Sequence, residues 1–364
     1  MLKSPFPYFG GKSKVAEIIW KTFGDIDMYI EPFCGSLAVL LASSKNEHRV
    51  ETVNDADHFI VNFWRAIKNN PEETASWTNN LNTEADLFSR HIWLVNEGKQ
   101  IISRCEGDPD FYSPKVAGWW VWGICNWIGS GWCDGKGSWT AYDGNIVNMN
   151  DKSKCGVNRN LLHLGPGRGV NRQLLHLGNA GMGVNRQRLH LGDAGMGVNR
   201  RLLHMGSAGM GVDTGLDAIY AMFAEITERI RYVRICCGDW ERICTRGALS
   251  RGSRVGIFLD PPYSNEVRSS GLYTHDDGDV TRRVHQWCLD NQDNPKYRII
   301  LAGYAEEYDL PGWETHSWVN SASYQRADAD MENGNAQNRK KETLWFSPNC
   351  IKNKQTSLFS LEKL

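Results

Sequence analysis

The stretch Asp260-Pro261-Pro262-Tyr263 has the residue types that most directly suggest chemistry. It follows the apolar run 257–259, which predicts a buried strand that stops at the prolines, because proline lacks the N–H that a sheet ladder needs. A carboxylate at the end of a central strand, beside an aromatic ring, suits a planar molecule that carries an amine: the ring stacks, and the carboxylate accepts an N–H. A simple strand followed by a proline turn is the alternative.

A glycine turn, Gly10-Gly11-Lys12-Ser13, precedes a helical pattern that runs from Val15 to Phe23. The two glycines permit a bend that approaches a ligand closely, and Lys12 is placed to meet a carboxylate or a phosphate at the helix start. The full P-loop pattern Gly-x-x-x-x-Gly-Lys-Ser is absent, and no strand precedes the turn. We therefore do not predict a nucleoside triphosphatase.

Two further strands are predicted to end in residues that suit a nucleotide. Residues 28–41 predict a strand, a turn at Gly35 and a helix, a combination that brings backbone N–H groups to a ligand. The strand at 49–53 runs into Asp55, which is placed to bind ribose hydroxyls. The alternative role of Asp55 is the N-cap of a helix from Phe59 to Ile67.

A third acid follows the strand at 233–237, where Asp239 could accept a hydrogen bond from an adenine amine with Trp240 packed nearby. Helices are expected at 216–232 and 280–291, and strands at 297–301 and 341–346. Strands that end in glycine or an acid and are linked by helices predict a doubly wound α/β sheet, with a ligand across its carboxyl edge.

The middle of the chain has a different composition. Residues 72–104 look helical, and the aromatic, glycine-containing stretch at 119–132 includes Trp127, whose ring could stack on bases or pack in a core. Residues 156–212 repeat a Gly-Val-Asn-Arg motif at spacings of 13 and then 14 residues. Counted from position 155 to 212, this region has seven arginines and one acid, in a chain of net charge −1. The arginines after each asparagine could contact phosphates, or the repeat could be a low-complexity insertion; they are Arg159, Arg172, Arg186 and Arg200.

At 364 residues, the chain is long enough for one large domain with an insertion, or for two domains. There is no charged-then-apolar leader and no long apolar run, so we expect a cytoplasmic protein that does not enter a membrane. The ten cysteines form no Cys-x-x-Cys pair and are expected to be buried free thiols. The repeated histidines have no cysteine or acid at ligand spacing, and we predict no metal site.

Five stretches, taken in their order, resemble the Dam-type, alpha-class DNA adenine methyltransferases. They are Tyr8-Phe9-Gly10-Gly11-Lys12, Glu31-Pro32-Phe33-Cys34-Gly35-Ser36, Asn54-Asp55-Ala56-Asp57, Asp260-Pro261-Pro262-Tyr263 and Glu342-Thr343-Leu344-Trp345. The resemblance implies a Rossmann-like, class I methyltransferase sheet. It also implies a catalytic domain of residues 1–70 and 214–364, with a target-recognition insertion at 71–213 that contains the repeat.

The resemblance further implies that S-adenosyl-L-methionine donates a methyl group to the N6 amine of an adenine flipped out of double-stranded DNA. Asp260, Pro261, Pro262 and Tyr263 would be catalytic. The implied cofactor-binding residues are Tyr8, Gly11, Lys12, Glu31, Phe33, Gly35, Asp55, Asp239 and Trp240. The implied DNA contacts are Trp127 and the four repeat arginines.

Three alternatives remain at the level of sequence. The acceptor could be the N4 amine of cytosine, or an adenine in RNA. The chain could also be a nucleic-acid-binding protein that has lost catalysis, although intact Asp260, Tyr263 and Gly35 argue against decay. No obligate protein partner is indicated, and one chain cannot distinguish a restriction-modification role from a phage or mobile-element role.

Overall fold

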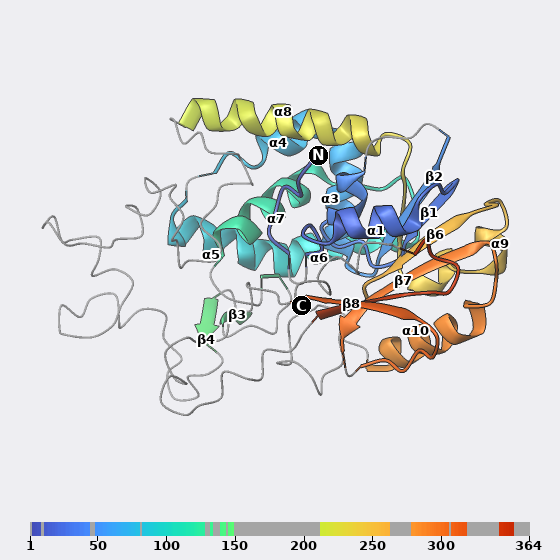
Figure 1. Cartoon of the computed structure of the whole chain (residues 1–364). Coiled ribbons are helices and arrows are strands. Elements are labelled where there is room, and N and C mark those ends of the chain that lie inside the picture. The colour runs from blue at the N-terminus through green and yellow to red at the C-terminus, as the bar shows by residue number, and fades with distance from the viewer. Residues whose placement is uncertain are drawn as a thin grey trace, which may run out of the picture.

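The computed structural model describes residues 2–8, 11–43, 48–80, 82–127, 132–133, 139–142, 145–148, 212–262, 278–305, 307–318 and 342–352. Within these ranges, a seven-stranded sheet is covered by helices on both faces (Figure 1). In spatial order, its strands are β5 (Arg234–Cys237), β2 (Val50–Asp55), β1 (Met28–Glu31), β6 (Val255–Leu259), β7 (Tyr297–Tyr304), β9 (Glu342–Phe346) and β8 (Glu314–Trp318).

The strand order reverses between β1 and β6. From β1 the chain continues outward to β2 and then to β5, whereas β6 pairs with β1 on one side and with β7 on the other, all in parallel. In the described sheet, β9 runs antiparallel to both of its neighbours, β7 and β8. In an open α/β sheet, ligands bind beyond the carboxyl ends of the strands at such a reversal, so the turns after β1 and β6 mark the expected site. The predicted doubly wound sheet is confirmed.

Side chains alternate along the strands and form one hydrophobic core on each face of the sheet. In β6, Phe258 joins the larger core, while Ile257 and Leu259 join the smaller one. The helices follow the predicted pattern closely at α1 (Ala16–Phe23), α2 (Ala38–Ala42), α3 (His58–Asn69), α8 (Val212–Ile230) and α10 (Gly278–Asn291). The smaller core packs under α10, η4 (Trp240–Ile243) and α9 (Arg246–Leu249).

The region after α3 consists of short helices, among them a helix that the sequence patterns did not predict. These segments are α4 (Pro71–Ser76), α5 (Glu84–Trp93), the π-helical turn η1 (Leu94–Gly98), α6 (Lys99–Ile102), η2 (Ser103–Glu106) and α7 (Pro114–Asn126). The unpredicted helix is α7, which packs against α3, and α4 packs against α8. The described part of the predicted insertion therefore shares the larger core of the sheet, and the insertion boundary at 71 stays a prediction.

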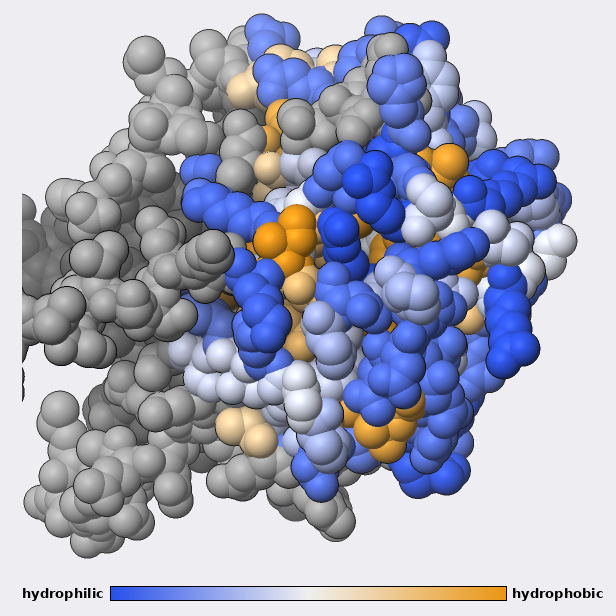
Figure 2. Space-filling view, turned by 45° about the vertical axis from the view of Figure 1, so that its right-hand side comes forward, coloured by the Kyte–Doolittle hydropathy of each residue, from blue (hydrophilic) through white to orange (hydrophobic). Residues whose placement is uncertain are grey.

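A two-stranded antiparallel pair, β3 (Trp139–Tyr142) and β4 (Asn145–Asn148), was not predicted, nor was edge strand β8. The nine described cysteines are free, and eight of them are buried, as expected. The face in Figure 2 is mostly hydrophilic, with small hydrophobic groups between the polar ones. Among the described residues, no helix has both the length and the apolar character that a membrane crossing requires.

Candidate cofactor pocket and active site

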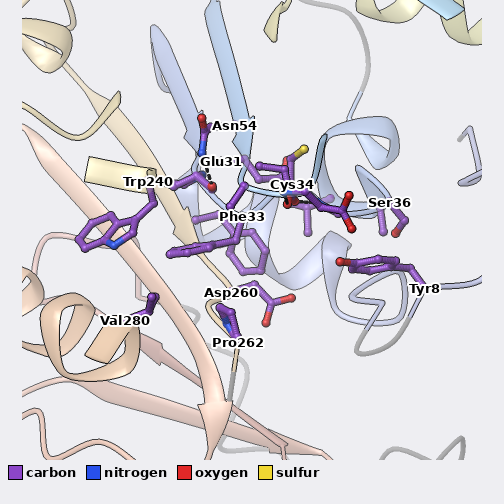
Figure 3. A pocket seen from close by; sticks show the side chains of 18 of the residues that line it. Tyr8, Glu31, Phe33, Cys34, Ser36, Asn54, Trp240, Asp260, Pro262 and Val280 are labelled. Carbon is purple, nitrogen blue, oxygen red and sulfur yellow. Dashed lines mark hydrogen bonds between the residues drawn. The ribbon is translucent and has the colours of Figure 1, made fainter. Parts of the chain in front are cut away.

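One pocket of about 370 Å³ lies at the reversal of strand order, and its size falls within the range of small-molecule sites. The structure brings all nine predicted cofactor residues to this pocket, together with two of the predicted catalytic ones (Figure 3). These are Tyr8, Gly11, Lys12, Glu31, Phe33, Gly35, Asp55, Asp239, Trp240, Asp260 and Pro262.

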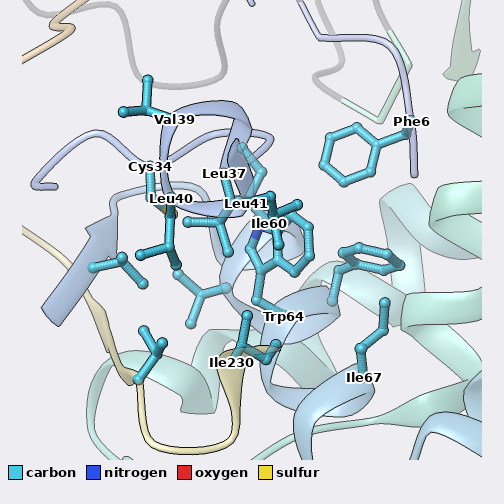
Figure 4. Close-up of a cluster of buried hydrophobic side chains, with 14 of the residues drawn as sticks. Phe6, Cys34, Leu37, Val39, Leu40, Leu41, Ile60, Trp64, Ile67 and Ile230 are labelled. Atoms are coloured by element: carbon cyan, nitrogen blue, oxygen red, sulfur yellow. The ribbon is translucent and has the colours of Figure 1, made fainter. Parts of the chain in front are cut away.

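The turn after β1 depends on glycine at position 35. Gly35 has φ +44°, and a Cβ there would lie 2.5 Å from the ring of Tyr8. The core fixes this turn from behind, because the buried indole of Trp64 donates a 2.8 Å hydrogen bond to the Gly35 carbonyl. Figure 4 shows the leucines of the α2 region packed beside Trp64. The glycine therefore allows an aromatic ring and the backbone to meet at the pocket wall.

Asp55, at the end of β2, is held by backbone groups. Its carboxylate accepts 2.9 Å hydrogen bonds from the N–H groups of Gly35 and Asp57. The N-cap of α3 is Asp57, whose side chain accepts from Phe59 N at 2.8 Å, so the alternative cap role for Asp55 is wrong. Burial raises the pKa of Asp55 to about 7, with Asp57 adding to the shift, although the backbone N–H groups oppose it.

Glu31 is a second buried carboxyl of the pocket. Its side chain accepts a 3.0 Å hydrogen bond from the hydroxyl of Tyr29. Burial raises the pKa of Glu31 well above its usual value; the nearby charges of Asp260 and Glu51 raise it further, while the Tyr29 hydrogen bond lowers it. A cation that entered the pocket would favour the charged forms of Glu31 and Asp55.

Aromatic and charged residues after β5 form another wall. The rings of Phe33 and Trp240 lie with centroids 5.8 Å apart at 34°, and Figure 3 shows them near Val280 on one side of the pocket. Asp239 precedes Trp240 and accepts hydrogen bonds from the guanidinium of Arg283 in α10. An apolar wall beside an anchored carboxylate suits a heterocycle that carries an amine.

Asp260 follows β6 directly and is held by a buried lysine. Lys12 Nζ lies 2.9 Å from Asp260 Oδ1 and 3.7 Å from Glu342 Oε2. The side chain of Lys12 is 3% exposed, and that of Asp260 is 21% exposed. Lys12 thus lies between the carboxylates of Asp260, which follows β6, and Glu342, in β9, and a carboxylate was one of the two partners that its place in the sequence suggested.

The pocket residues that were not predicted include His58, Glu106 and Val280. Glu106 comes from η2, and His58 Nε2 lies 3.8 Å from Glu106 Oε2. The buried guanidinium of Arg65 holds this segment by donating to the carbonyls of Cys105 and Asp108 at 2.9 Å. His58 directly follows the predicted Asp55-Ala56-Asp57 stretch, which was a usable signal, whereas nothing in the local sequence marks Glu106.

Not every predicted site residue is part of the pocket. Trp127 is 4% exposed and stacks on His91, with ring centroids 4.8 Å apart, which favours the packing interpretation over a DNA contact. Pro261 is buried beside the pocket-lining Pro262. Tyr263 and the repeat arginines (Arg159, Arg172, Arg186 and Arg200) lie outside the described residues.

The pocket's chemistry fits S-adenosylmethionine. Glycine 35 leaves room that a Cβ would fill, and Phe33 and Val280 provide an apolar wall. The acidic side chains suit the cofactor's hydroxyl and amine donors and its positive sulfonium. These acids are Glu31, Asp55, Asp57, Glu106, Asp239 and Asp260.

The strand order and the position of the pocket are those of an α/β fold consistent with a class I methyltransferase. Residues 8–94 match the family model for D12 class N6 adenine-specific DNA methyltransferase, a segment that includes β1, β2 and the helices from α1 to α5. This match supports a Dam-type adenine methyltransferase, an enzyme whose family implies S-adenosylmethionine as methyl donor and DNA as substrate. No curated protein matches the chain.

Proposed function

We propose that this enzyme methylates the N6 amine of an adenine that is flipped out of double-stranded DNA, with Asp260 as the catalytic carboxylate. One observation carries the proposal: Asp260 directly follows β6 at the reversal of strand order and shares one pocket with every predicted cofactor residue. The acceptor amine and the methyl donor would therefore meet at one carboxylate. The family match favours adenine in DNA over the cytosine and RNA alternatives.

The work of the protein in this reaction is positioning and electrostatics. Bound S-adenosylmethionine supplies an electrophilic methyl group on a positive sulfur. Asp260 and the Pro261 carbonyl accept the two N–H groups of the adenine amine, which moves electron density onto a nitrogen whose lone pair is otherwise delocalised into the ring. Lys12 holds the Asp260 carboxylate in place through its 2.9 Å contact.

The remaining residues bind and orient the two reactants. Asp55 accepts from the ribose hydroxyls, and Asp239 accepts from the amine of the cofactor's adenine. The extruded target base costs a few kcal/mol to unstack, and stacking on Tyr263 would offset part of that cost. Neither a covalent enzyme intermediate nor a metal is required by this arrangement of acceptors.

The test is transfer of tritiated methyl from S-adenosylmethionine to unmethylated duplex DNA, followed by digestion to nucleosides. Wild type should label N6-methyladenine. Asp260→Ala should reduce labelling by about a hundredfold or more while cofactor binding persists, and Asp110→Ala, at an exposed position, is the matched control. Label in methylcytosine would correct the base, and an active Asp260→Ala variant would refute the catalytic role.

We also propose that the arginines of the repeat contact DNA phosphates. Neutralising each phosphate contributes about −0.9 to the slope of log K against log salt. Changing Arg159, Arg172, Arg186 and Arg200 together to glutamine should therefore reduce the slope by about 3 to 4 if each meets one phosphate. The same four positions changed to lysine keep the charge and should keep the slope. Equal slopes for wild type and the glutamine variant would exclude these contacts.

A further inference from the structure

Arg283 of α10 makes a set of contacts that neither the sequence patterns nor the predicted site includes. Its Nη2 donates to both carboxylate oxygens of Asp239, at 2.9 and 3.1 Å. Its Nε donates to Glu241 Oε1 at 2.9 Å. The guanidinium carbon lies 5.8 Å from the ring centroid of Trp240. One side chain therefore contacts three successive residues after β5.

These contacts connect two walls of the pocket. Asp239 and Trp240 line it, and so does Val280 from the same helix as Arg283. One residue further along α10, the hydroxyl of Thr281 donates a 3.1 Å hydrogen bond to the carbonyl of Pro262 in the catalytic turn. The first turns of α10 thus hold the Asp260-Pro261-Pro262 turn and the acid after β5 in a fixed relation.

The contacts of Asp239 limit what else it can accept. A carboxylate has about four lone-pair sites, two on each oxygen. Oδ1 accepts from Glu241 N at 2.9 Å and from Arg283, and Oδ2 accepts from Arg283. Among the contacts of the described residues, one site on Oδ2 remains. Such an acceptor can take a single N–H, which matches one hydrogen of an exocyclic amine.

We propose that Arg283 is a positioning residue that makes the pocket specific for a 6-amino purine, by fixing the Asp239 carboxylate that accepts the amine. The inference rests on the proposed function, in which Asp239 faces the cofactor's adenine. A general stabilising role accounts for the contacts less well. The side chains of Arg283, Asp239 and Glu241 are 28%, 45% and 50% exposed, and ion pairs so exposed to water contribute little to stability.

The experiment compares the affinity of the full-length protein for S-adenosylmethionine and for its 6-oxo counterpart, S-inosylmethionine, by equilibrium dialysis. Wild type should prefer the amine, because a carboxylate faces an oxygen instead of an N–H in the 6-oxo compound. Arg283→Ala should lose most of that preference, with the dissociation constant for S-adenosylmethionine rising about tenfold and that for the 6-oxo compound changing little. If Arg283 only stabilised the fold, Arg283→Ala would lower the affinity for both compounds equally.

Arg282→Ala is the matched control, since this neighbouring arginine is 79% exposed and pairs with Asp279 instead. It should keep the wild-type preference. Arg283→Lys keeps the charge but not the forked donation, and should show an intermediate preference for S-adenosylmethionine. If Arg283→Ala does not fold, Arg283→Lys tests the proposal in its place. Wild-type preference in both Arg283 variants would overturn the inference and leave the proposed function standing. A wild-type protein that binds neither compound would overturn both.

Discussion

Two acids of the pocket end parallel strands of the same sheet, yet they are held by different means. Asp55, after β2, is fixed by backbone N–H groups from nearby turns. Asp260, after β6, is fixed by the side chain of Lys12, which also lies close to Glu342. The proposed cofactor side is therefore set by main-chain geometry, whereas the proposed catalytic side is set by charges from distant parts of the chain. The geometry around Asp55 should therefore be sensitive to changes in backbone shape, and the geometry around Asp260 to changes in charge.

The largest effect should come from removing the charge on the catalytic side. Lys12→Met would leave the Asp260 and Glu342 carboxylates close together without their shared cation, and breaking a buried pair costs about 3–5 kcal/mol. Methyl transfer should be lost, and urea unfolding should show the fall in stability. Lys14→Met, at an exposed position, should do neither. A Lys12→Met variant as stable as wild type would mean that the catalytic side does not depend on this cation.

A smaller effect should follow from a change of backbone shape on the cofactor side. Gly35→Ala places a Cβ against the Tyr8 ring at a positive φ, which we expect to cost about 1–3 kcal/mol. Cofactor affinity should fall, whereas the rate at saturating cofactor should be largely kept because Asp260 and Lys12 are untouched. Gly247→Ala is the control, as nothing lies within 4 Å of its added Cβ. Equal losses of affinity and saturated rate would show that the two sides are not separable.

The mildest change is one of pH. The pKa of Asp55 is raised to about 7 in the folded protein, so Asp55 holds a proton over a range in which the unfolded chain has lost it. Stability from this group therefore falls as pH rises from about 4 to 7, whereas cofactor affinity, which needs the carboxylate, should fall as pH drops below about 7.

If one proton is released on binding, cofactor affinity can change by at most about tenfold per pH unit. The dissociation constant of S-adenosylmethionine should be measured from roughly pH 5.5 to about pH 8.5, a range that brackets the Asp55 pKa of about 7. Asp55→Asn should bind more weakly at high pH and show a flatter profile. If the pH dependence of affinity were unchanged in Asp55→Asn, another group would be responsible. Glu31 would be the first candidate, because it is also a buried carboxyl with a raised pKa.

The strands around the pocket could be predicted because each pairs an apolar run with a glycine or an acid at its end. Helix α7 could not, since Gly118 and Gly123 made its tryptophan-rich stretch look like irregular backbone. In the structure, those glycines make room for Trp77 and Trp132, where a Cβ would lie within 2.5 Å of each. The usable signal was at the helix start, where Ser113 caps α7 and proline occupies its first turn.

The missed site residues have a common physical cause. Glu106 reaches the pocket because Arg65 holds its segment, and Arg283 reaches Asp239 because α10 packs against the smaller core. Both positions depend on tertiary contacts, which no local pattern of residue types records. Strand β8 was missed for another reason: its polar, half-exposed residues at the sheet edge lack an apolar run.

The placement of β9 has a consequence for synthesis on the ribosome. This strand lies inside the sheet between β7 and β8, although it is the last described strand in sequence order, and it carries Glu342 to the side chain of Lys12. The chain must therefore be synthesised as far as β9 before this inner strand can insert and Lys12 can meet its second carboxylate. A nascent chain, or one that ends prematurely before β9, lacks this strand and that carboxylate. Transfer through the proposed Asp260 site would then begin only once β9 has been synthesised and inserted.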